Sequence, residues 1–343
     1  LNTLAATPGK KDKQDIVSTF TEDERRIVKL ALDPTITYFV AKLAAPTTTG
    51  TAEWDVAEFD LLAKLSSRQL TGNDALQQID FSLRELSPAS GELLRRVILK
   101  DLRCGVGTTI MNKAFPGLIP DFPYMRCTLP KDSNFEKFDW AGGIYSQLKA
   151  NGMFARIDHD NEGQVLVTSR QGNTFPDKAL VHIERSVRSA FHRGTQTHGE
   201  LTVHIDGVLQ TRAIGNGILN SLLSGGDLPN NADVHFDAWD QIPLSDAVVG
   251  GKCLKPYGAR LASLHPQLLA HKYSVLHLVE TLLVYSKAEA MAHYREQLAK
   301  GLEGTVCKSP DAIWKDGDNK DQVKLKLQID VDLEIVGFRE GTE

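Results

Sequence analysis

The chain has 343 residues, of which 41% are hydrophobic and 24% are charged. This composition excludes an intrinsically disordered chain, a collagen-like repeat, a coiled coil and a small disulfide-stapled scaffold. The length predicts about two domains. A formal net charge of −5 argues against a wholly cationic coat for nucleic acid, although it leaves room for a basic groove on an acidic body.

The residues at 15–115 have the pattern of short helices separated by polar breaks, which predicts an all-α first domain. Leucines and a valine at helical spacing predict one helix over 92–103, with Gly105 just past its end. Six basic residues stand against three acidic ones between positions 84 and 113. Any phosphate-binding patch of this half is expected there, and a solvated helix face is the alternative interpretation.

Four prolines between positions 115 and 139 interrupt all periodicity and place the domain boundary near residue 128. Beyond it the pattern changes to strands. Hairpins are expected over 152–169 and at the Asp206-Gly207 turn, and helices over 176–193 and 287–300. The second domain is therefore expected to be α+β.

Strict alternation of apolar and polar residues predicts a strand from Val323 to Ile335. Lys324 and Lys326 lie on its polar face, about 6.6 Å apart at ~3.3 Å per residue. Two ammonium groups this close suggest that an anion binds between them. A solvent-exposed lysine pair that protects an edge strand is an equally common arrangement.

The four cysteines, Cys104, Cys127, Cys253 and Cys307, are widely spaced, and no histidine stands at zinc-finger spacing. Neither disulfides nor structural zinc is expected, and a reduced cytoplasmic setting fits best. No apolar run approaches the ~18 residues of a membrane-spanning helix. We expect a monomer with no membrane partner.

A lysine between a predicted strand and a glycine turn, Lys149 before Gly152, has the placement of an amine nucleophile. By itself this spacing is weak, and a surface lysine at a turn is the more common case. Five further segments follow in order: 169–172 (SRQG), 198–201 (HGEL), 236–240 (FDAWD), 302–308 (LEGTVCK) and 323–326 (VKLK).

As a set, these segments resemble the covalent nucleotidyltransferase superfamily of ATP-dependent DNA ligases, RNA ligases and messenger-RNA capping enzymes. The first half sharpens the resemblance. The segments 70–73 (LTGN), 94–97 (LRRV), 100–105 (KDLRCG) and 115–120 (FPGLIP) are similar to the helical DNA-binding domain of the T-even phage type of ATP-dependent DNA ligase. The segment 330–337 (DVDLEIVG) resembles the approach to that family's C-terminal oligonucleotide-binding (OB) barrel.

This resemblance implies a multidomain fold. An all-α DNA-binding domain would occupy 1–128, and an α+β nucleotidyltransferase (adenylation) domain with antiparallel sheets would occupy 129–330. Residues 331–343 would begin an OB-fold whose remainder is missing, either because it is truncated or because it is not resolved. The implied reaction attaches AMP from ATP to Lys149, transfers it to the 5′-phosphate at a nick in duplex DNA, and displaces it with the adjacent 3′-OH.

The resemblance also assigns the other site residues. Glu200 and Glu303 would bind Mg²⁺, Lys324 and Lys326 would neutralise the α-phosphate, and Trp239 would stack on adenine. Gln147 would hydrogen-bond the edge of adenine, and Arg170 would contact ribose or the nick phosphate. Arg260 and Lys308 would lie near the nucleotide. DNA contacts in the first domain are expected from Arg95, Arg96, Lys100, Arg103 and Lys113.

Two positions depart from the family pattern. The DNA ligases usually have Asp and Arg where this chain has Asn151 and Phe154. Arg156 shares a strand face with Phe154 and is hypothesised to replace the missing Arg. The sequence KANG also resembles the nucleophile motif of some RNA ligases, which leaves an RNA-sealing ligase as the alternative. A capping guanylyltransferase is less favoured still. A non-catalytic module that binds DNA nicks or ends is the alternative of a different class, and retention of the charged motif residues argues against it.

Overall fold

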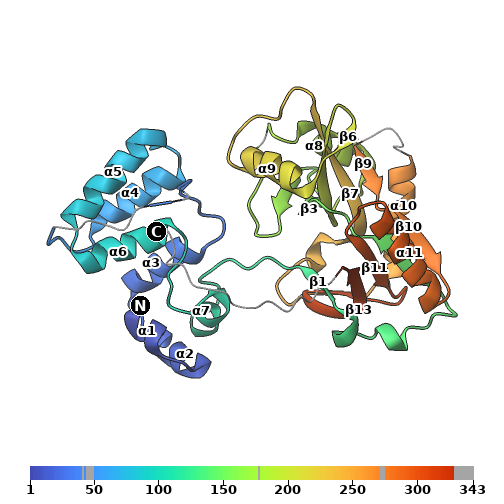
Figure 1. The fold of residues 1–343 in the computed structure, drawn as a ribbon, viewed down its shortest axis with the longest axis horizontal. Helices are drawn as coiled ribbons and strands as arrows, with labels where there is room; N and C mark the ends of the chain where they lie inside the picture. Colours follow the sequence, from blue (N-terminus) through green and yellow to red (C-terminus); the bar gives the residue numbers. More distant parts are fainter. Residues whose placement is uncertain (41, 44–49, 177, 271–274, 328–343) are drawn as a thin grey trace, which may run out of the picture. The chain divides into compact units, whose positions relative to one another are not determined.

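The computed structural model describes residues 1–40, 42–43, 50–176, 178–270 and 275–327. They form two compact units, one of Leu1–Asp121 and one that begins at Phe122, which are described separately (Figure 1). The expected start of a barrel at 331–343 lies outside the described residues, as does the alternating pattern beyond position 327.

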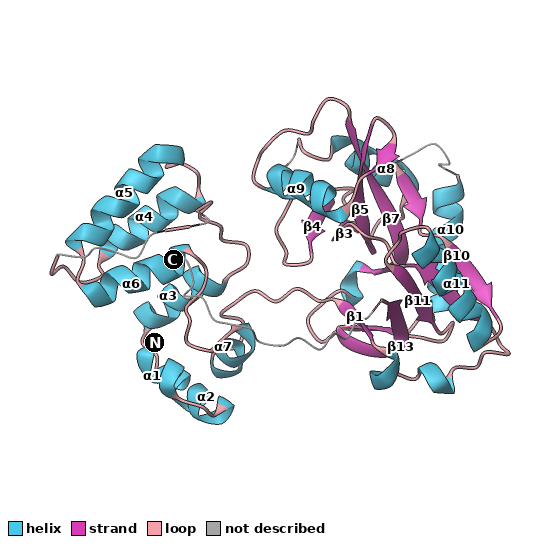
Figure 2. Cartoon of the chain, viewed as in Figure 1, coloured by secondary structure: helices cyan, strands magenta, loops and turns pink. Residues whose placement is uncertain are grey.

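The first unit is built from helices around a core that includes Leu62, Ile79, Leu94 and Val97, all of which are fully buried (Figure 2). Within its described residues the helices are α1 (Asn2–Ala6), α2 (Lys10–Ser18), α3 (Glu22–Leu32), α4 (Val56–Ser66), α5 (Gly72–Glu85), α6 (Pro88–Ile98) and α7 (Thr108–Ala114). The helical pattern expected over 15–115 is thus present. No described helix of the chain is long and apolar enough to cross a membrane.

Helix α6 differs from the helix expected over 92–103. It begins four residues earlier, at Pro88, because the Ser87 side chain caps its first turn and proline suits the first helical position. It ends at Ile98, and the following segment holds Lys100 and Arg103 at φ of 60° and 49°. These left-handed conformations are incompatible with a continuing helix.

The second unit contains two large sheets and the helices that cover them. Its strands are β1 (Met125–Thr128), β2 (Ile144–Leu148), β3 (Met153–His159), β4 (Val165–Ser169), β5 (Thr195–Ile205), β6 (Val208–Leu209), β7 (Ala232–Pro243), β8 (Lys252–Cys253), β9 (Leu276–Leu278), β10 (Thr281–Val284), β11 (Gly304–Lys308), β12 (Trp314–Lys315) and β13 (Gly317–Lys326). Its α-helices are α8 (Val181–Ala190), α9 (Arg212–Leu223), α10 (Tyr257–Leu269) and α11 (Lys287–Ala299), with short 3₁₀ turns at Pro130–Asp132, Phe135–Lys137 and Leu244–Asp246.

One sheet has the order β4-β3-β5-β7-β9, with β6 paired to β5, and the other has the order β1-β13-β11-β2-β10. Helices α8, α9 and α10 contribute apolar residues to the core beside the first sheet, and α11 packs against the second. The expectation of antiparallel sheets is wrong at two places. Strand β1 runs parallel to β13, and β7 runs parallel to β9, so both sheets are mixed.

Both expected hairpins are confirmed. Strands β3 and β4 pair antiparallel, and β5 and β6 meet at Asp206 and Gly207, whose φ angles of 51° and 77° suit a type I′ turn. Helix α11 begins at Lys287 as expected. Helix α8 begins five residues later than the expected start at 176.

The proline-rich segment at the boundary of the units contains strand β1, which its composition does not predict. Along the chain the boundary between the units falls between Asp121 and Phe122, and β1 already belongs to the second unit, where Met125 pairs with Gly317. Division into functional domains near residue 128 remains a prediction.

Candidate active site

Lys149 stands immediately after β2, the strand between β11 and β10. Its backbone N–H donates to the carbonyl of Gly304 at 2.9 Å, and its Nζ lies 2.6 Å from Glu303 Oε1. About a quarter of the side chain is exposed. The end of β2 and the start of β11 thus hold the expected nucleophile beside a carboxylate.

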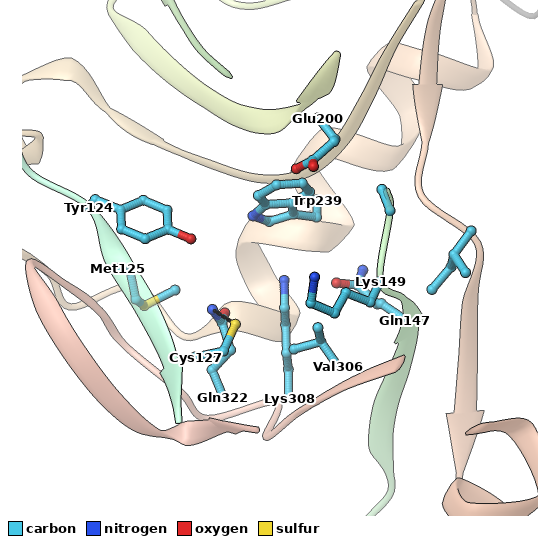
Figure 3. A pocket seen from close by; sticks show the side chains of 12 residues that line it. Tyr124, Met125, Cys127, Gln147, Lys149, Glu200, Trp239, Val306, Lys308 and Gln322 are labelled. Atoms are coloured by element: carbon cyan, nitrogen blue, oxygen red, sulfur yellow. Dashed lines mark hydrogen bonds between the residues drawn. The ribbon is translucent and has the colours of Figure 1, made fainter. Parts of the chain in front are cut away.

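A pocket opens beside Lys149, with about 530 Å³ of empty space that includes some open solvent. This lies within the ~300–1,000 Å³ common for small-molecule sites. Figure 3 shows the side chains of Lys149 and Lys308 directed toward Trp239 and Glu200. The pocket is lined by Tyr124, Met125, Cys127, Gln147, Leu148, Lys149, Ala150, Glu200, Trp239, Val306, Lys308 and Gln322.

The indole of Trp239 forms one wall of the pocket. The hydroxyl of Tyr257 donates to the backbone carbonyl of Trp239 at 2.8 Å, and the ring of Phe154 lies 6.0 Å from the indole, centroid to centroid. Backbone and ring are therefore both supported by neighbouring aromatics. A fixed flat apolar surface of this kind suits stacking of a nucleobase.

Gln147 presents an unused acceptor at the pocket. The Thr281 hydroxyl donates to Val279 O at 2.7 Å, so its oxygen accepts from Gln147 Nε2 at 2.9 Å. This fixes the amide orientation and leaves Gln147 Oε1 buried without a hydrogen-bond partner. A buried acceptor is costly unless it is satisfied, and an exocyclic amine on a base would satisfy it.

Lys308 is 3% exposed and lies under the aromatic wall. Its Nζ is 5.8 Å from the ring centre of Trp239 and 4.7 Å from that of Tyr257. Burial lowers the pKa of Lys308 to about 8, against the opposing effect of Asp240. This cation is held where its charge is costly, which indicates a negative or electron-rich ligand in the pocket.

Glu303 pairs with Lys149, and Glu200 lines the same pocket as Lys149. Burial raises the pKa of Glu200 to about 7; the N–H of Gly152, which donates to its Oε1 at 3.0 Å, opposes this rise, while the charge of Glu303 adds to it. Glu303 Oε2 is buried without a hydrogen-bond partner, and Arg212 Nη1 approaches it to 4.0 Å.

Two adjacent carboxylates with an unsatisfied oxygen fit a hard divalent cation. Among the described residues no group of three or more His, Cys, Asp or Glu side chains could hold a metal ion. A cation at Glu200 and Glu303 would therefore take its remaining ligands from phosphate and water, as Mg²⁺ does in many phosphoryl-transfer sites.

Lys324 and Lys326 lie on β13 opposite Val306 and Gly304 of β11. Directly opposed residues share a sheet face, so both lysines lie on the side of the pocket-lining Val306. Lys324 is partly buried and Lys326 is exposed. Neither is among the residues that line the pocket, and their contact with the α-phosphate remains a prediction.

Arg260 and Arg156, both expected near the nucleotide, have buried side chains with partners in the protein. Arg260 is 1% exposed, and its guanidinium makes two bonds to Asp240, at 2.7 and 2.9 Å. Arg156 is 7% exposed, donates to Thr168 Oγ1 at 2.8 Å and lies over the ring of Phe122. Both are bound within the protein, and their contact with nucleotide remains a prediction.

Arg170 is exposed, and its guanidinium lies 4.6 Å from the ring centre of Tyr124. It lines a second, polar groove that also contains Lys149 and Glu200. This groove includes Arg212, Asn216 and Asn220 of α9, to which the sequence interpretation gave no role.

The expected DNA-binding cations of the first unit differ in availability. Arg103 and Lys113 are exposed. Arg95 and Arg96 are mostly buried, and both contact Glu92. The Nζ of Lys100 donates to two backbone carbonyls at 2.7 and 3.0 Å, and burial lowers its pKa to about 8. Lys100 is thus engaged inside its unit.

The pocket residues that sequence reasoning missed include Gln322, Tyr124 and Cys127. Gln322 could have been found, because it continues the alternation of Lys324 and Lys326 along β13. Tyr124 and Cys127 stand in the proline-rich segment, where no periodicity marks a strand.

The family profile described as "ATP dependent DNA ligase domain" matches residues 130–326, which hold Lys149 and every motif placed around it. The chain belongs to the ATP-dependent DNA ligases. It is 28% identical to the DNA ligases of Enterobacteria phages T6 and T4, over 98% of this chain and 77% of each relative. The solved structure titled "Pmar-Lig_Pre." has the same fold, with a TM-score of 0.72, 20% identity, and coverage of 95% of this chain and 76% of that one.

Proposed function

We propose that Lys149 is the residue of this ATP-dependent DNA ligase that carries AMP between ATP and a nick in duplex DNA. The amine of Lys149 attacks the α-phosphorus of ATP, forms a P–N bond and expels pyrophosphate. An oxygen of the DNA 5′-phosphate then attacks the same phosphorus, and the lysine leaves. The 3′-OH attacks the activated 5′-phosphate, forms the phosphodiester and releases AMP.

The observation that carries this proposal is the convergence of a nucleophile and a nucleoside pocket at the end of β2. Lys149 lines the same pocket as Trp239 and Gln147. Adenine stacked on Trp239, with its amino group at Gln147 Oε1, would direct the sugar and phosphate toward Lys149. In-line displacement at phosphorus depends mainly on such positioning and on neutralised charge.

Glu200 and Glu303 would hold Mg²⁺, which when bound neutralises phosphate charge beside the nucleophile. The chain's own cations would act in the same direction. Lys324 lies on the pocket face of β13, and Lys308 lies under the aromatic wall. Arg170, exposed at the neighbouring groove, suits phosphate because its planar fork can donate two parallel hydrogen bonds.

The helical unit would supply contacts to the DNA backbone, with Arg103 and Lys113 the most accessible of its expected cations. This assigns DNA binding to residues 1–128 and adenylation to 129–330. Salt-dependent binding is the expected consequence of phosphate contacts.

A sealing assay tests this function. The protein is mixed with Mg²⁺, ATP and a duplex that carries one 5′-³²P nick, with the strands at the nick made of DNA or of RNA. We expect sealing of nicked DNA, with an adenylylated DNA intermediate that disappears as product forms. Sealing of the RNA nick alone would select the RNA-ligase alternative, and tight binding of the nick without sealing would select the non-catalytic module.

A further inference from the structure

The polar groove beside Lys149 continues away from the nucleotide pocket, with which it shares Tyr124, Lys149 and Glu200. Its far wall is α9. Arg212, Asn216 and Asn220 stand four residues apart, so they form one face of this helix, and all three line the groove. The outward side of the same helix carries Ile214, which is 49% exposed.

The groove-facing side of α9 contains an unsatisfied polar atom. Asn216 Oδ1 is buried and has no hydrogen-bond partner in the described structure. Such an atom destabilises the folded chain unless a ligand completes it. A carboxamide offers both a donor and an acceptor without charge, which suits the mixed donors and acceptors of a nucleotide.

Two arginine side chains in the groove, Arg170 and Arg212, make it suited to bind phosphate. The Arg212 side chain is 58% exposed at the start of α9, and Arg170 extends from the turn after β4 over the ring of Tyr124. Arginine donates in a planar fork that matches phosphate oxygens. Arg212 lies 4.0 Å from Glu303, and both arginines line the same groove as Glu200, so the groove presents phosphate-binding groups near the expected metal carboxylates.

In-line displacement requires the attacking or leaving oxygen to lie opposite Lys149 across the α-phosphorus. With adenosine in the pocket, the groove offers a second space beside Lys149. We propose that the α9 face of Arg212, Asn216 and Asn220 binds the phosphate-bearing 5′ strand of the nicked DNA. It places a 5′-phosphate oxygen to form its bond with phosphorus as the P–N bond to Lys149 breaks. This inference rests on the proposed function.

The pyrophosphate of ATP also carries phosphate groups and could bind in the same groove. Measuring self-adenylylation and AMP transfer to DNA separately distinguishes a groove that binds pyrophosphate from one that binds the DNA strand. Transfer of label from α-³²P-ATP to the protein reports the first step without DNA. Transfer of AMP from isolated adenylylated protein to a nicked duplex reports the second. The variants are Asn216→Ala, Asn216→Asp and Arg212→Ala, and Ile214→Ala is the matched control on the outward side of α9.

We expect Asn216→Ala to slow AMP transfer to DNA at least tenfold more than it slows self-adenylylation. Asn216→Asp should slow transfer further, because it adds a negative charge that faces phosphate. Arg212→Ala should lower the slope of log affinity against log salt by about 1, as expected for one lost phosphate contact. Ile214→Ala should stay within twofold of the parent in both steps.

The proposal would be overturned if the α9 variants slowed self-adenylylation and AMP transfer equally, or if Arg212→Ala left the salt slope unchanged. If the variants slowed mainly self-adenylylation, the groove would be assigned to pyrophosphate. Thermal unfolding of each variant identifies misfolding, and Arg212→Lys, which keeps the charge, should then restore the salt slope. A parent protein that never labels itself would contradict the proposed function. A parent that seals nicks while the α9 variants behave like Ile214→Ala would contradict only the groove assignment.

Discussion

The buried ammonium group of Lys308 lowers the free energy of unfolding at neutral pH, and it places a positive charge in the nucleotide pocket. Burial lowers its pKa from 10.5 to about 8, so the folded chain favours the neutral amine more than the unfolded chain does. The resulting stabilisation is present above pH 10.5 and is lost as the pH falls through about 8. At neutral pH the folded chain therefore carries an ammonium group at a cost.

Replacement of this amine by an apolar side chain should remove that cost. We expect Lys308→Met to raise the free energy of unfolding at pH 7 by up to about 3 kcal/mol, with the gain shrinking as the pH approaches 10.5. Affinity for ATP should fall. Urea unfolding of parent and variant at pH 7 and pH 10 measures the effect, and a gain that does not depend on pH would contradict it.

The family resemblance selected five residues that the structure gathers at one pocket: Gln147, Lys149, Glu200, Trp239 and Lys308. It could not separate these from Arg260 and Arg156, whose guanidinium groups are bound inside the protein. The type and spacing of a charged residue do not show whether it is buried, and a buried partner such as Asp240 becomes evident only when β7 and α10 pack together. The same limit explains Lys100, whose ammonium group is held by backbone carbonyls of α3 and its C-terminal end.

At the scale of elements, the approach of β3 to β5 depends on one glycine. A Cβ at Gly152 would lie 2.1 Å from the carbonyl oxygen of Leu201, and the Gly152 N–H donates to Glu200. No larger residue fits here without moving the start of β3. The glycine is thus needed for close approach, and its hydrogen bond orients an expected metal ligand.

We expect Gly152→Ala to lower the rate of self-adenylylation by roughly tenfold to a hundredfold, which corresponds to the ~1.5–3 kcal/mol of a lost hydrogen bond to a charged group. Gly217→Ala is the matched control, because a Cβ there meets nothing within 4 Å. Quantifying labelled protein from α-³²P-ATP over time compares the two. Equal rates in both variants would show that the close approach is unimportant.

Elements with local signals were predicted well, and elements fixed by distant contacts were not. The β5–β6 turn follows from the Asp206-Gly207 pair, and the start of α11 from its sequence pattern. Strand β1 has no periodicity of its own and exists through parallel pairing with β13, almost two hundred residues later. The early end of α6 depends on two left-handed residues, which sequence pattern does not reveal.

For the whole molecule, the proposal requires the helical unit to contribute charge to DNA binding despite the net charge of −5. We expect the double variant Arg103→Ala/Lys113→Ala to weaken binding of nicked duplex and to lower its salt slope by up to about 2. Arg188→Ala is a matched control, since Arg188 is an exposed arginine of the second unit that pairs with Glu184 at 3.4 Å and lies outside the expected patch. Fluorescence anisotropy across a salt series measures both quantities.

An unchanged slope for the double variant would remove Arg103 and Lys113 from the DNA interface. Self-adenylylation in the absence of DNA separates a binding defect from misfolding. Lys100→Ala should behave differently from the double variant. The Lys100 ammonium group donates to two backbone carbonyls, so we expect this variant to weaken DNA binding through the stability of the helical unit.

The identity of the nucleotide-carrying residue is tested most directly by mapping the adenylyl group. The protein is incubated with Mg²⁺ and ATP, digested, and analysed by mass spectrometry, alongside Lys149→Arg and the exposed-lysine control Lys300→Arg. We predict an AMP adduct on Lys149 in the parent and in Lys300→Arg, and none in Lys149→Arg. An adduct on another residue, or undiminished adenylylation of Lys149→Arg, would contradict the assignment of Lys149 as the nucleophile.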